Sequence, residues 1–354
     1  MIKNKFTKLL MLWNDKHNKR QMPWKGEKDP YKIWLSEVIL QQTRVEQGWG
    51  YYEKFIEKYP SVFHLAKAKD EEVFKLWEGL GYYNRCKNLL FTARFIVEKH
   101  NGIFPSTYEE IIALKGVGSY TASAIASFAF DLPYAVVDGN VFRVLSRFFA
   151  IKSAIDSKEG KQLFSSLAQE YIDKKQPGKY NQAIMDFGAT ICKPALPLCY
   201  SCLLHGVCEA NQIGIVNYLP IKERVLSKKN RWFYYFVFRC KNQILIHKRM
   251  QNDIWQNLYE FYLLESDESL KWTDSFVHQW IYDQFGIKKK KNVEISKIFS
   301  QQLTHQIIKG QFIEVKLNKI PSVLKHHQWI EAKELKNFPF PKFINQYSVI
   351  TANQ

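Results

Sequence analysis

A glycine-punctuated stretch, Leu114 to Arg147, most restricts what this chain can fold into. Near its start, Gly116-Val117-Gly118 separates two helical patterns, Tyr108 to Leu114 and Tyr120 to Phe130. Glycine takes positive φ angles at little cost, so the sequence predicts a tight turn between two helices. The second helix consists of small and apolar residues, and we therefore expect it to be buried.

The backbone amides around this turn predict a binding site for an anion. The amides of Gly116, Gly118 and Ser119 lie where a helix begins, so they lack helical partners and the helix dipole favours negative charge. An ordinary turn between two packed helices has the same Gly-x-Gly pattern. The motif by itself does not decide between the two interpretations.

Asp138 stands directly before an amphipathic helical pattern, Val141 to Arg147, and is expected to cap that helix. The helix dipole and the nearby amides should keep its carboxylate ionised and lower its pKa. Apolar residues precede it at Ala135 to Val137, which favours a position on the floor of a cleft. The alternative is a cap with no further role.

Glu37 is a second acidic candidate, because its helical neighbours are mostly apolar. At helical spacing it is flanked by Ile33, Trp34, Leu40 and Gln41. An ionised carboxylate is costly in such surroundings, so its pKa should rise and make it a usable acid near neutral pH. Most glutamates lie on the surface, and these neighbours are the reason to expect otherwise here.

Four of the six cysteines lie within seventeen residues, with the spacing C-x6-C-x2-C-x5-C. A cytosolic chain argues against disulfides, and four thiolates suit either zinc or an iron–sulfur cluster. The spacing alone leaves both open. The candidate ligands are Cys192, Cys199, Cys202 and Cys208.

Size and charge indicate a basic protein with two domains. The chain has 354 residues, of which 46% are hydrophobic, and a net charge of +17, which suits a polyanionic partner such as nucleic acid without requiring one. It has no apolar run of about eighteen residues, and its basic N-terminal segment lacks a signal-peptide core. We expect a monomer in the bacterial cytosol, without membrane contact.

The residue pattern changes once along the chain. Residues 1–212 are typical of helices with short loops, including a helix from Pro30 to Gln47 capped by Asp29, and residues 213–230 are expected to be a linker. Residues 231–354 are rich in aromatic and β-branched residues and predict an α+β domain. Its expected elements are strands at Trp232 to Cys240, Gln243 to Lys248, Gly310 to Leu317 and His327 to Ile330, a helix at Ser275 to Phe285, and a solvated loop at Lys288 to Lys291.

Three segments resemble a known family. They are LKGVGSYTA (114–122), VVDGNVFRVLSR (136–147) and WLSEVILQQTRV (34–45), and they are similar to the helix-hairpin-helix DNA glycosylases, within them the MutY-type adenine DNA glycosylases. The resemblance implies an all-α helix-hairpin-helix glycosylase domain with a [4Fe-4S] cluster loop at 192–208, followed by an α+β Nudix or MutT-like domain. It also implies that the turn amides named above hold a DNA phosphate and that the four cysteines hold the cluster. The loop at 193–198 carries one cation, Lys193, fewer than is usual in the family, which weakens it as a phosphate contact.

The same resemblance implies roles for the acidic candidates. Glu37 would protonate adenine as the catalytic acid, and Asp138 would stabilise the sugar cation, a division of labour that glycosidic cleavage needs. Asn140 would position water or Asp138. Tyr120 stands where relatives that also cut the DNA strand place a lysine nucleophile, and a phenol forms no Schiff base. The chain is therefore expected to be a monofunctional glycosylase.

Three further residues are expected to contact DNA through the same resemblance. Gln42 and Tyr82 match residues that wedge into the base stack, and an aromatic side chain in a glycine-rich loop suits that task. Lys25 ends the segment Pro23-Trp24-Lys25, and the family commonly has arginine at the position of Lys25. Lysine keeps the positive charge and lacks the forked guanidinium that makes paired hydrogen bonds.

The second domain resembles the MutT-like domain of adenine glycosylases. Residues 255–261, WQNLYEF, are similar to a family motif, whereas the glutamate-rich metal-binding helix of active Nudix hydrolases is missing, so we expect no pyrophosphatase activity. Thr304 and His305 match the loop that senses 8-oxoguanine. The alternative for His305 is an ordinary residue at a strand end.

These observations predict a DNA base-excision-repair glycosylase that removes adenine opposite 8-oxoguanine or guanine in double-stranded DNA. Two other functions stay open. One is an endonuclease III-like glycosylase and lyase, which Tyr120 and the second domain oppose. The other is a non-catalytic metal-cluster protein that binds DNA, which the presence of both Glu37 and Asp138 opposes.

Overall fold

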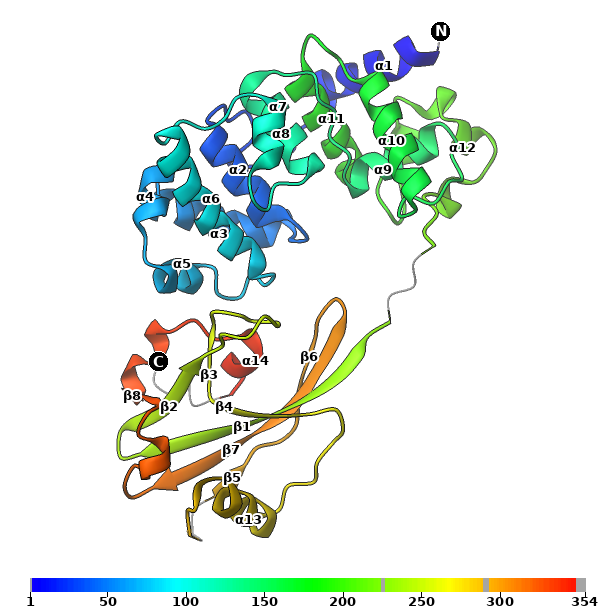
Figure 1. The fold of residues 1–354 in the computed structure, drawn as a ribbon. Coiled ribbons are helices and arrows are strands. Elements are labelled where there is room, and N and C mark those ends of the chain that lie inside the picture. Colours follow the sequence, from blue (N-terminus) through cyan, green and yellow to red (C-terminus); the bar gives the residue numbers. More distant parts are fainter. Residues whose placement is uncertain (1, 224–226, 289–292, 348–354) are drawn as a thin grey trace. The chain divides into compact units, whose positions relative to one another are not determined.

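The computed structural model describes residues 2–223, 227–288 and 293–347 of the chain (Figure 1). Contacts between Cα atoms divide the chain into two compact units. Unit 1 consists of Met1–Ala68 and Lys87–Val225, and unit 2 consists of Lys69–Cys86 and Leu226–Gln354. The expected domain boundaries at residues 212 and 231 stay predictions, and most of the lysine run at 288–291 lies outside the described residues.

Unit 1 is built of helices, as the sequence predicts. None of the helices among the described residues is both long and apolar enough to cross a membrane. The helices are α1 (Ile2–His17), α2 (Pro30–Leu40), α3 (Val45–Lys58), α4 (Val62–Lys67), α6 (Asn84–His100, whose first residues belong to unit 2), α7 (Tyr108–Ala113), α8 (Ser119–Phe130), α9 (Gly139–Phe148), α10 (Lys158–Tyr171), α11 (Pro177–Thr190) and α12 (Glu209–Gln212), with 3-10 turns at Cys199–Ser201, His205–Val207 and Val216–Tyr218.

Helix α2 begins as expected and ends earlier than expected. Asp29 caps it by accepting a hydrogen bond from the amide of Tyr31, and Pro30 occupies its first turn. The prediction of one helix as far as Gln47 is wrong, because the backbone leaves the helical conformation at Gln41 and Gln42 has a φ of 56°. This break gives α2 and α3 separate directions, and most of α2 is buried.

The glycine turn between α7 and α8 has the predicted form in part. Gly116 has a φ of 82°, and a Cβ atom there would meet the Cβ of Asn88 at 2.7 Å, so this position needs glycine. Gly118 has a φ of −95° and serves as the N-cap of α8, so only one of the two glycines uses a left-handed conformation. Helix α8 is buried along Thr121 to Ser127, as its apolar composition predicts.

The core around the second half of unit 1 joins its first helix to later ones. Phe6, Leu10 and Trp13 of α1 are buried with apolar residues of α9, α10 and α11. Trp13 meets Phe187 of α11 with ring centroids 5.0 Å apart. This packing holds α9 and α11 beside each other, so residues far apart in sequence approach the same site.

Unit 2 combines a mixed sheet with helices, which confirms the α+β prediction. The strand order is β3-β2-β1-β7-β5, with β4 also paired to β1, β6 to β7 and β8 to β2. Strands β1 and β7 run parallel over their full length, and the other pairs are antiparallel. The elements are α5 (Asp70–Leu76), β1 (Lys229–Cys240), β2 (Gln243–Lys248), β3 (Tyr259–Glu260), β4 (Tyr262–Ser266), α13 (Asp274–Phe285), β5 (Val293–Ile295), β6 (Phe299–Gln302), β7 (Gln306–Leu317), β8 (Gln328–Glu331) and α14 (Lys342–Asn345), with 3-10 turns at Ser322–Leu324 and Ala332–Asn337.

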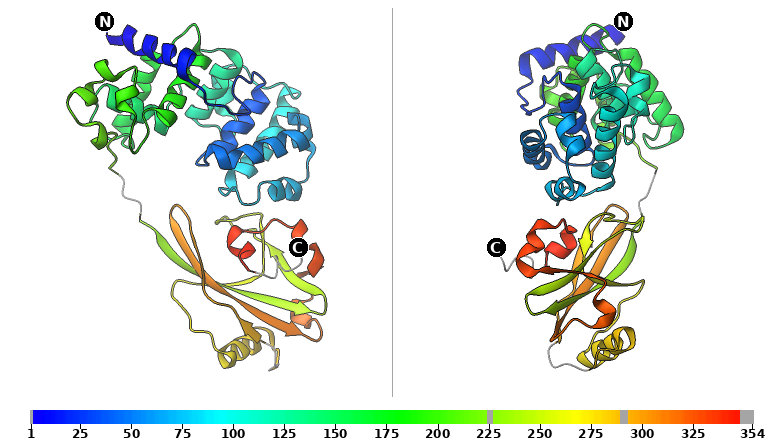
Figure 2. Two further views of the ribbon diagram at one scale, coloured as in Figure 1. Left: turned by 180° about the vertical axis from the view of Figure 1, so that it is seen from behind. Right: turned by 60° about the vertical axis from the view of Figure 1, so that its left-hand side comes forward.

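Helices cover both faces of this sheet (Figure 2). Val277 and Ile281 of α13 are buried against one face, in a cluster that includes Phe236 of β1. On the other face, Phe343 of α14 packs against Tyr235 at 6.2 Å between ring centroids. The alternation of side chains along β1 sends its aromatic residues to both layers, which explains why the strand is rich in them.

Candidate active site and cysteine pocket

Glu37 is buried in the middle of α2, as its apolar neighbours predict. Its exposed fraction is 6%, and Ile33 and Trp34 on the same helix are buried beside it. Burial raises the pKa of Glu37 to about 7; a hydrogen bond with Tyr120 works in the opposite direction, and the charge of Asp138 adds to the rise. A glutamate with this pKa is partly protonated at neutral pH and can donate a proton.

Asp138 caps α9 as predicted and lies within electrostatic range of Glu37. Its Oδ1 accepts from the amide of Val141 at 2.8 Å, and its Oδ2 accepts from Nδ2 of Asn140 at 2.7 Å. The expectation of a lowered pKa is wrong, because burial raises the pKa of Asp138 more than these hydrogen bonds and the charge of Arg143 lower it. The donors still favour the ionised carboxylate, since an ionised carboxylate is the better acceptor.

Tyr120, in the first turn of α8, contacts Glu37 and lies within electrostatic range of Asp138. It hydrogen-bonds Glu37, and its hydroxyl lies 3.4 Å from the sulfur of Met185. Burial raises the pKa of Tyr120 well above its ordinary value, with the charges of Glu37 and Asp138 adding to the effect. The phenol therefore stays protonated and acts as a hydrogen-bond donor at neutral pH.

Arg143 of α9 links this site to the first cysteine of the cluster segment. Its Nη2 donates to Oδ1 of Asn140 at 2.8 Å and to the carbonyl of Gly188 at 2.6 Å, and its Nε donates to the carbonyl of Cys192 at 2.7 Å. The Asn140 amide is thus held on both sides, since its Nδ2 binds Asp138. One guanidinium fixes the orientation of the Asp138 region relative to the segment that carries the cysteines.

Glu37 lines a pocket of about 460 Å³ that lies between α2, α8 and α11. Trp24 and Lys25 from the segment before α2 line it, and Gln182 lines it from α11. Gln182 was not expected from the sequence, because it stands in no short motif that indicates a binding site, and Trp24 was noted only as the neighbour of Lys25. Their shared position results from tertiary packing.

Lys25 is held by an ion pair at the edge of this pocket. Its Nζ donates to Oδ2 of Asp186 and to the carbonyl of Arg20, both at 2.9 Å. The expected direct contact between Lys25 and DNA stays a prediction. The structure places this lysine beside Glu37 among the residues that line the pocket.

The predicted DNA-contacting turn is open to solvent. Gly116, Gly118 and Ser119 are exposed, and the N-cap residue of α8, Gly118, has no side chain that could accept a hydrogen bond there. Gln42 is exposed with a φ of 56°, and Tyr82 is 43% exposed with a φ of 49°. Both proposed wedges therefore stand on strained, exposed turns, which is where side chains can enter a base stack.

Thr304 and His305 occupy the tight turn between β6 and β7 in unit 2. The amide of Leu303 donates to the carbonyl of Gln306 at 2.8 Å and closes this turn. Within the same unit, the hydroxyl groups of Tyr82 and Thr304 are hydrogen-bonded. The structure thus brings a residue expected to wedge into DNA next to one expected to sense the lesion.

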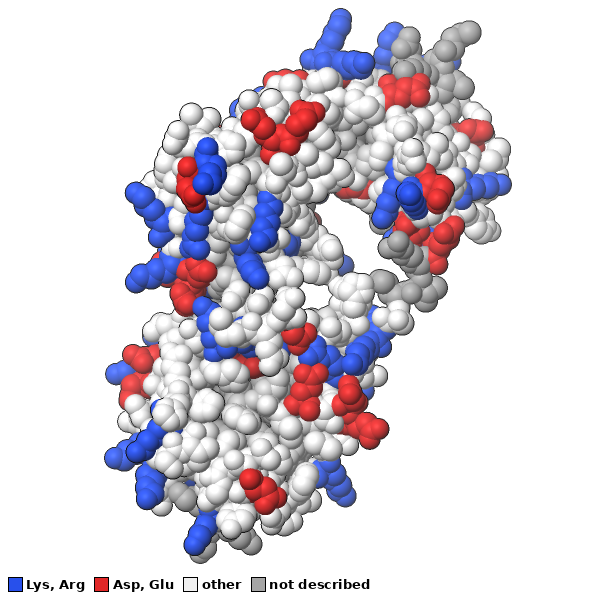
Figure 3. All heavy atoms as spheres, in the orientation of Figure 1, with Lys and Arg blue, Asp and Glu red and all other residues white. Residues whose placement is uncertain are grey.

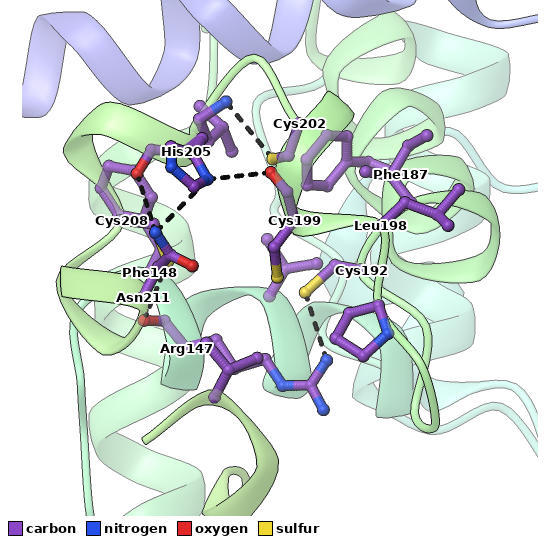
Figure 4. Close-up of a pocket in the computed structure, with 15 residues that line it drawn as sticks. Arg147, Phe148, Phe187, Cys192, Leu198, Cys199, Cys202, His205, Cys208 and Asn211 are labelled. Atoms are coloured by element: carbon purple, nitrogen blue, oxygen red, sulfur yellow. Dashed lines mark hydrogen bonds between the residues drawn. The ribbon is translucent and has the colours of Figure 1, made fainter. Parts of the chain in front are cut away.

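The four cysteines of the cluster segment surround one pocket (Figure 4). Arg147 Nη1 lies 3.5 Å from the sulfur of Cys192, and the amide of Leu204 lies 3.3 Å from the sulfur of Cys202. All six cysteines are free thiols. Among the described residues, no three His, Cys, Asp or Glu side chains are grouped closely enough to hold one metal ion.

The electrostatics of this pocket disfavour several thiolates at once. Burial raises the pKa of Cys202 to about 12, and the other three cysteines contribute to that rise. Burial also raises the pKa of Cys199 and Cys208. Several partly buried thiolates repel one another unless a cation lies between them. The side chain of His205 faces the backbone, and its Nδ1 lies 3.0 Å from the carbonyl oxygen of Cys199.

Surface charge alone does not identify the DNA-binding face. On the face drawn in Figure 3, Lys and Arg side chains are spread over both units among Asp and Glu side chains. The net charge of +17 is therefore distributed rather than gathered in one patch on this face. The geometry around Glu37 identifies the candidate site.

Comparisons with known proteins show which proteins the chain is similar to. A family model described as HhH-GPD superfamily base excision DNA repair protein matches residues 35–170, and a NUDIX domain model matches residues 234–348. An adenine DNA glycosylase of Buchnera aphidicola subsp. Baizongia pistaciae is 34% identical over 319 residues, which cover 89% of this chain and 87% of that protein. An adenine DNA glycosylase of Buchnera aphidicola subsp. Acyrthosiphon pisum is 31% identical over 353 residues, or 97% and 96% of the two chains. A solved thermostable thymine-DNA glycosylase is similar with a TM-score of 0.56 and 28% identity, over 60% of this chain and 97% of that one.

Proposed function

The chain belongs to the adenine DNA glycosylases, within the HhH-GPD superfamily of base excision DNA repair proteins, and from this premise we propose that it removes adenine mispaired with 8-oxoguanine or guanine. The observation that carries the proposal is the position of Glu37. It is a buried acid with a pKa of about 7, it opens into a pocket, and it lies within electrostatic range of Asp138. The proposed substrate is chromosomal DNA, so we also propose that the protein acts in the bacterial cytosol.

In the proposed reaction, adenine leaves the duplex and enters the pocket beside Glu37. Protonated Glu37 transfers its proton to a ring nitrogen of adenine, and the bond between that base and the sugar breaks with its electron pair on the base. The Asp138 carboxylate stabilises the positive charge that develops on the sugar. Water then adds to the sugar carbon, and its proton returns to Glu37.

Tyr120 and Asn140 support the two acids in this proposal. The Tyr120 phenol donates a hydrogen bond within the site, and having no amine it forms no Schiff base with the opened sugar. Asn140 holds Oδ2 of Asp138 in place. The enzyme therefore excises the base without cutting the strand.

A direct assay tests this function against its two alternatives. Duplexes with adenine opposite 8-oxoguanine, adenine opposite guanine, and thymine glycol are incubated with the protein and analysed with and without alkali. The proposal predicts excision of adenine alone and strand breaks that need alkali. Strand breaks without alkali, together with efficient borohydride trapping, would support the lyase alternative. DNA binding with no excision would support the non-catalytic alternative.

The four cysteines are proposed to hold a [4Fe-4S] cluster, with zinc as the alternative. They line one pocket from a 3-10 turn and its flanking loops, so a bound cluster would supply four metal–sulfur bonds that tie this segment together. Arg147 donates to the sulfur of Cys192 and to the carbonyls of Lys193 and Pro194, which stabilises the same segment. The role proposed is structural.

Replacing Cys199 with serine should reduce bound iron and destabilise unit 1. We expect the purified protein to be brown with about four irons per chain, and the variant to lose iron, DNA binding and several degrees of its thermal unfolding midpoint. Cys240→Ala is the matched control, because Cys240 is a buried thiol of unit 2 and should leave the iron content unchanged. A colourless protein with one zinc per chain would contradict the cluster assignment.

Thr304 and His305 are proposed to read the base opposite adenine. 8-Oxoguanine differs from guanine by one carbonyl and one ring hydrogen, so discrimination needs polar side chains at that edge. Replacing both residues with alanine should reduce the preference for 8-oxoguanine over guanine by about tenfold or more, since a single lost hydrogen bond contributes roughly 1–3 kcal/mol when its partner would go unpaired. Gln302→Ala, at an exposed position of β6, is the control. An unchanged preference in the double variant would show that this turn does not read the lesion.

A further inference from the structure

The pocket beside Glu37 has a buried carboxylate behind it that the proposed reaction does not use. Asp186 of α11 has no exposed surface. Four side chains donate hydrogen bonds to it, each at 2.9 Å: Asn18, Arg20, Lys25 and Gln182. Two of these donors, Lys25 and Gln182, also line the pocket.

Asp186 determines how the amide of Gln182 is oriented. A glutamine amide carries donors on its nitrogen and an acceptor on its oxygen, whereas an ionised carboxylate only accepts. Gln182 must therefore turn its Nε2 toward Asp186, where it lies 2.9 Å from Oδ1. The carbonyl oxygen of Gln182 therefore lies on the side of the amide away from Asp186, in a residue that lines the pocket.

Asp186 also limits the freedom of Lys25. An ammonium group has three N–H donors. Two of them bind Oδ2 of Asp186 and the carbonyl of Arg20. The ion pair keeps the lysine at the edge of the pocket and balances the buried carboxylate.

We propose that Asp186 is a positioning residue that sets the hydrogen-bond polarity of the base pocket. By holding the Gln182 amide in one orientation, it makes the pocket accept a purine with an amine on C6 and disfavour a purine with a carbonyl there. An amine donates to the Gln182 oxygen, whereas a carbonyl would place two acceptors against each other. The inference rests on the proposed function, because it assumes that the pocket receives the excised base.

The test compares excision of adenine and of hypoxanthine, each opposite 8-oxoguanine, under single-turnover conditions. Hypoxanthine keeps the purine ring and replaces the C6 amine with a carbonyl. In Asp186→Asn, the new amide can donate to Gln182 and allow it to turn round. We expect the ratio of the two rates to fall about tenfold or more, because a pocket built to pair one polar group rejects its opposite strongly. A general loss of stability would lower both rates together and leave the ratio unchanged.

Two further variants separate positioning from folding. Asn18→Ala removes another hydrogen bond to the same carboxylate from a residue outside the pocket lining, so the ratio should stay within about twofold of wild type. In a Gln182→Met background, Asp186→Asn should change the ratio no further, since the effect acts through Gln182. If Asp186→Asn does not fold, Gln182→Met alone should still lower the ratio about tenfold.

The outcomes distinguish the two proposals. Any of three results would overturn the role of Asp186. The first is a wild-type ratio of adenine to hypoxanthine excision in folded Asp186→Asn, and the second is a wild-type ratio in Gln182→Met alone. The third is that Asp186→Asn changes the ratio as much in the Gln182→Met background as in the wild-type protein. If the wild-type protein removes no adenine from any duplex, the proposed function fails first. Circular dichroism of each variant shows whether it is folded.

Discussion

Glu37→Gln should lower the single-turnover rate of adenine excision by about three orders of magnitude while the protein still binds its duplex. The amide has nearly the same size as the acid and cannot supply the proton that makes adenine a leaving group. The measurement is the excision rate with enzyme in excess, alongside the dissociation constant for uncleaved duplex.

The pH dependence of the wild-type rate checks the same residue. Burial raises the pKa of Glu37 to about 7, so the active protonated form is complete well below pH 7 and is lost as the pH rises through that value. The rate should therefore fall on the alkaline side, and Glu37→Gln should show no such fall. Glu46→Gln, at an exposed position in the first turn of α3, should behave as wild type. A Glu37→Gln variant with more than a few per cent of the wild-type rate would show that the acid is elsewhere.

The sequence predicted those features that depend on neighbouring residues. Asp29 and Asp138 were recognised as helix caps because a cap needs only its own side chain and the next few amides. The burial of Glu37 was predictable because apolar residues surround it on one helix. Strands β1, β2, β7 and β8 of unit 2 followed from their aromatic and β-branched residues, although β7 begins earlier than expected, at Gln306. The shorter strands β3, β4 and β5 were not expected.

Features set by distant parts of the chain could not be predicted in this way. The pKa of Asp138 was expected to fall because the cap and helix dipole were considered, whereas burial among residues of other helices dominates. Three of the four donors to Asp186, namely Asn18, Arg20 and Lys25, lie more than 160 positions away in the sequence, and no local pattern indicates this grouping. The grouping of Lys69–Cys86 with the C-terminal sheet is likewise a product of contacts between distant segments.

Asp138→Asn should reduce adenine excision by about 100-fold to 1,000-fold with little change in stability. Asparagine caps helices about as well as aspartate, so the bond from the Val141 amide can persist while the negative charge is lost. Asp138→Ala should lose excision to a similar degree and cost about 1 kcal/mol more in stability, because it removes the cap as well. Excision rates and thermal unfolding of the two variants separate these contributions.

The remaining activity of Asp138→Asn should also carry a shifted pH profile. The charge of Asp138 helps to raise the pKa of Glu37, so neutralising it should lower that pKa and move the alkaline fall in rate to lower pH. If Asp138 had a purely structural role, Asp138→Asn would have a lower excision rate, and the midpoint of its alkaline fall in rate would stay at the wild-type pH. If the midpoint stays near pH 7 and the rate falls less than about tenfold, Asp138 does not act on the reacting sugar. A shift together with a large loss would show that the two carboxylates work as one coupled pair, in which Asp138 both stabilises the cation and keeps Glu37 protonated.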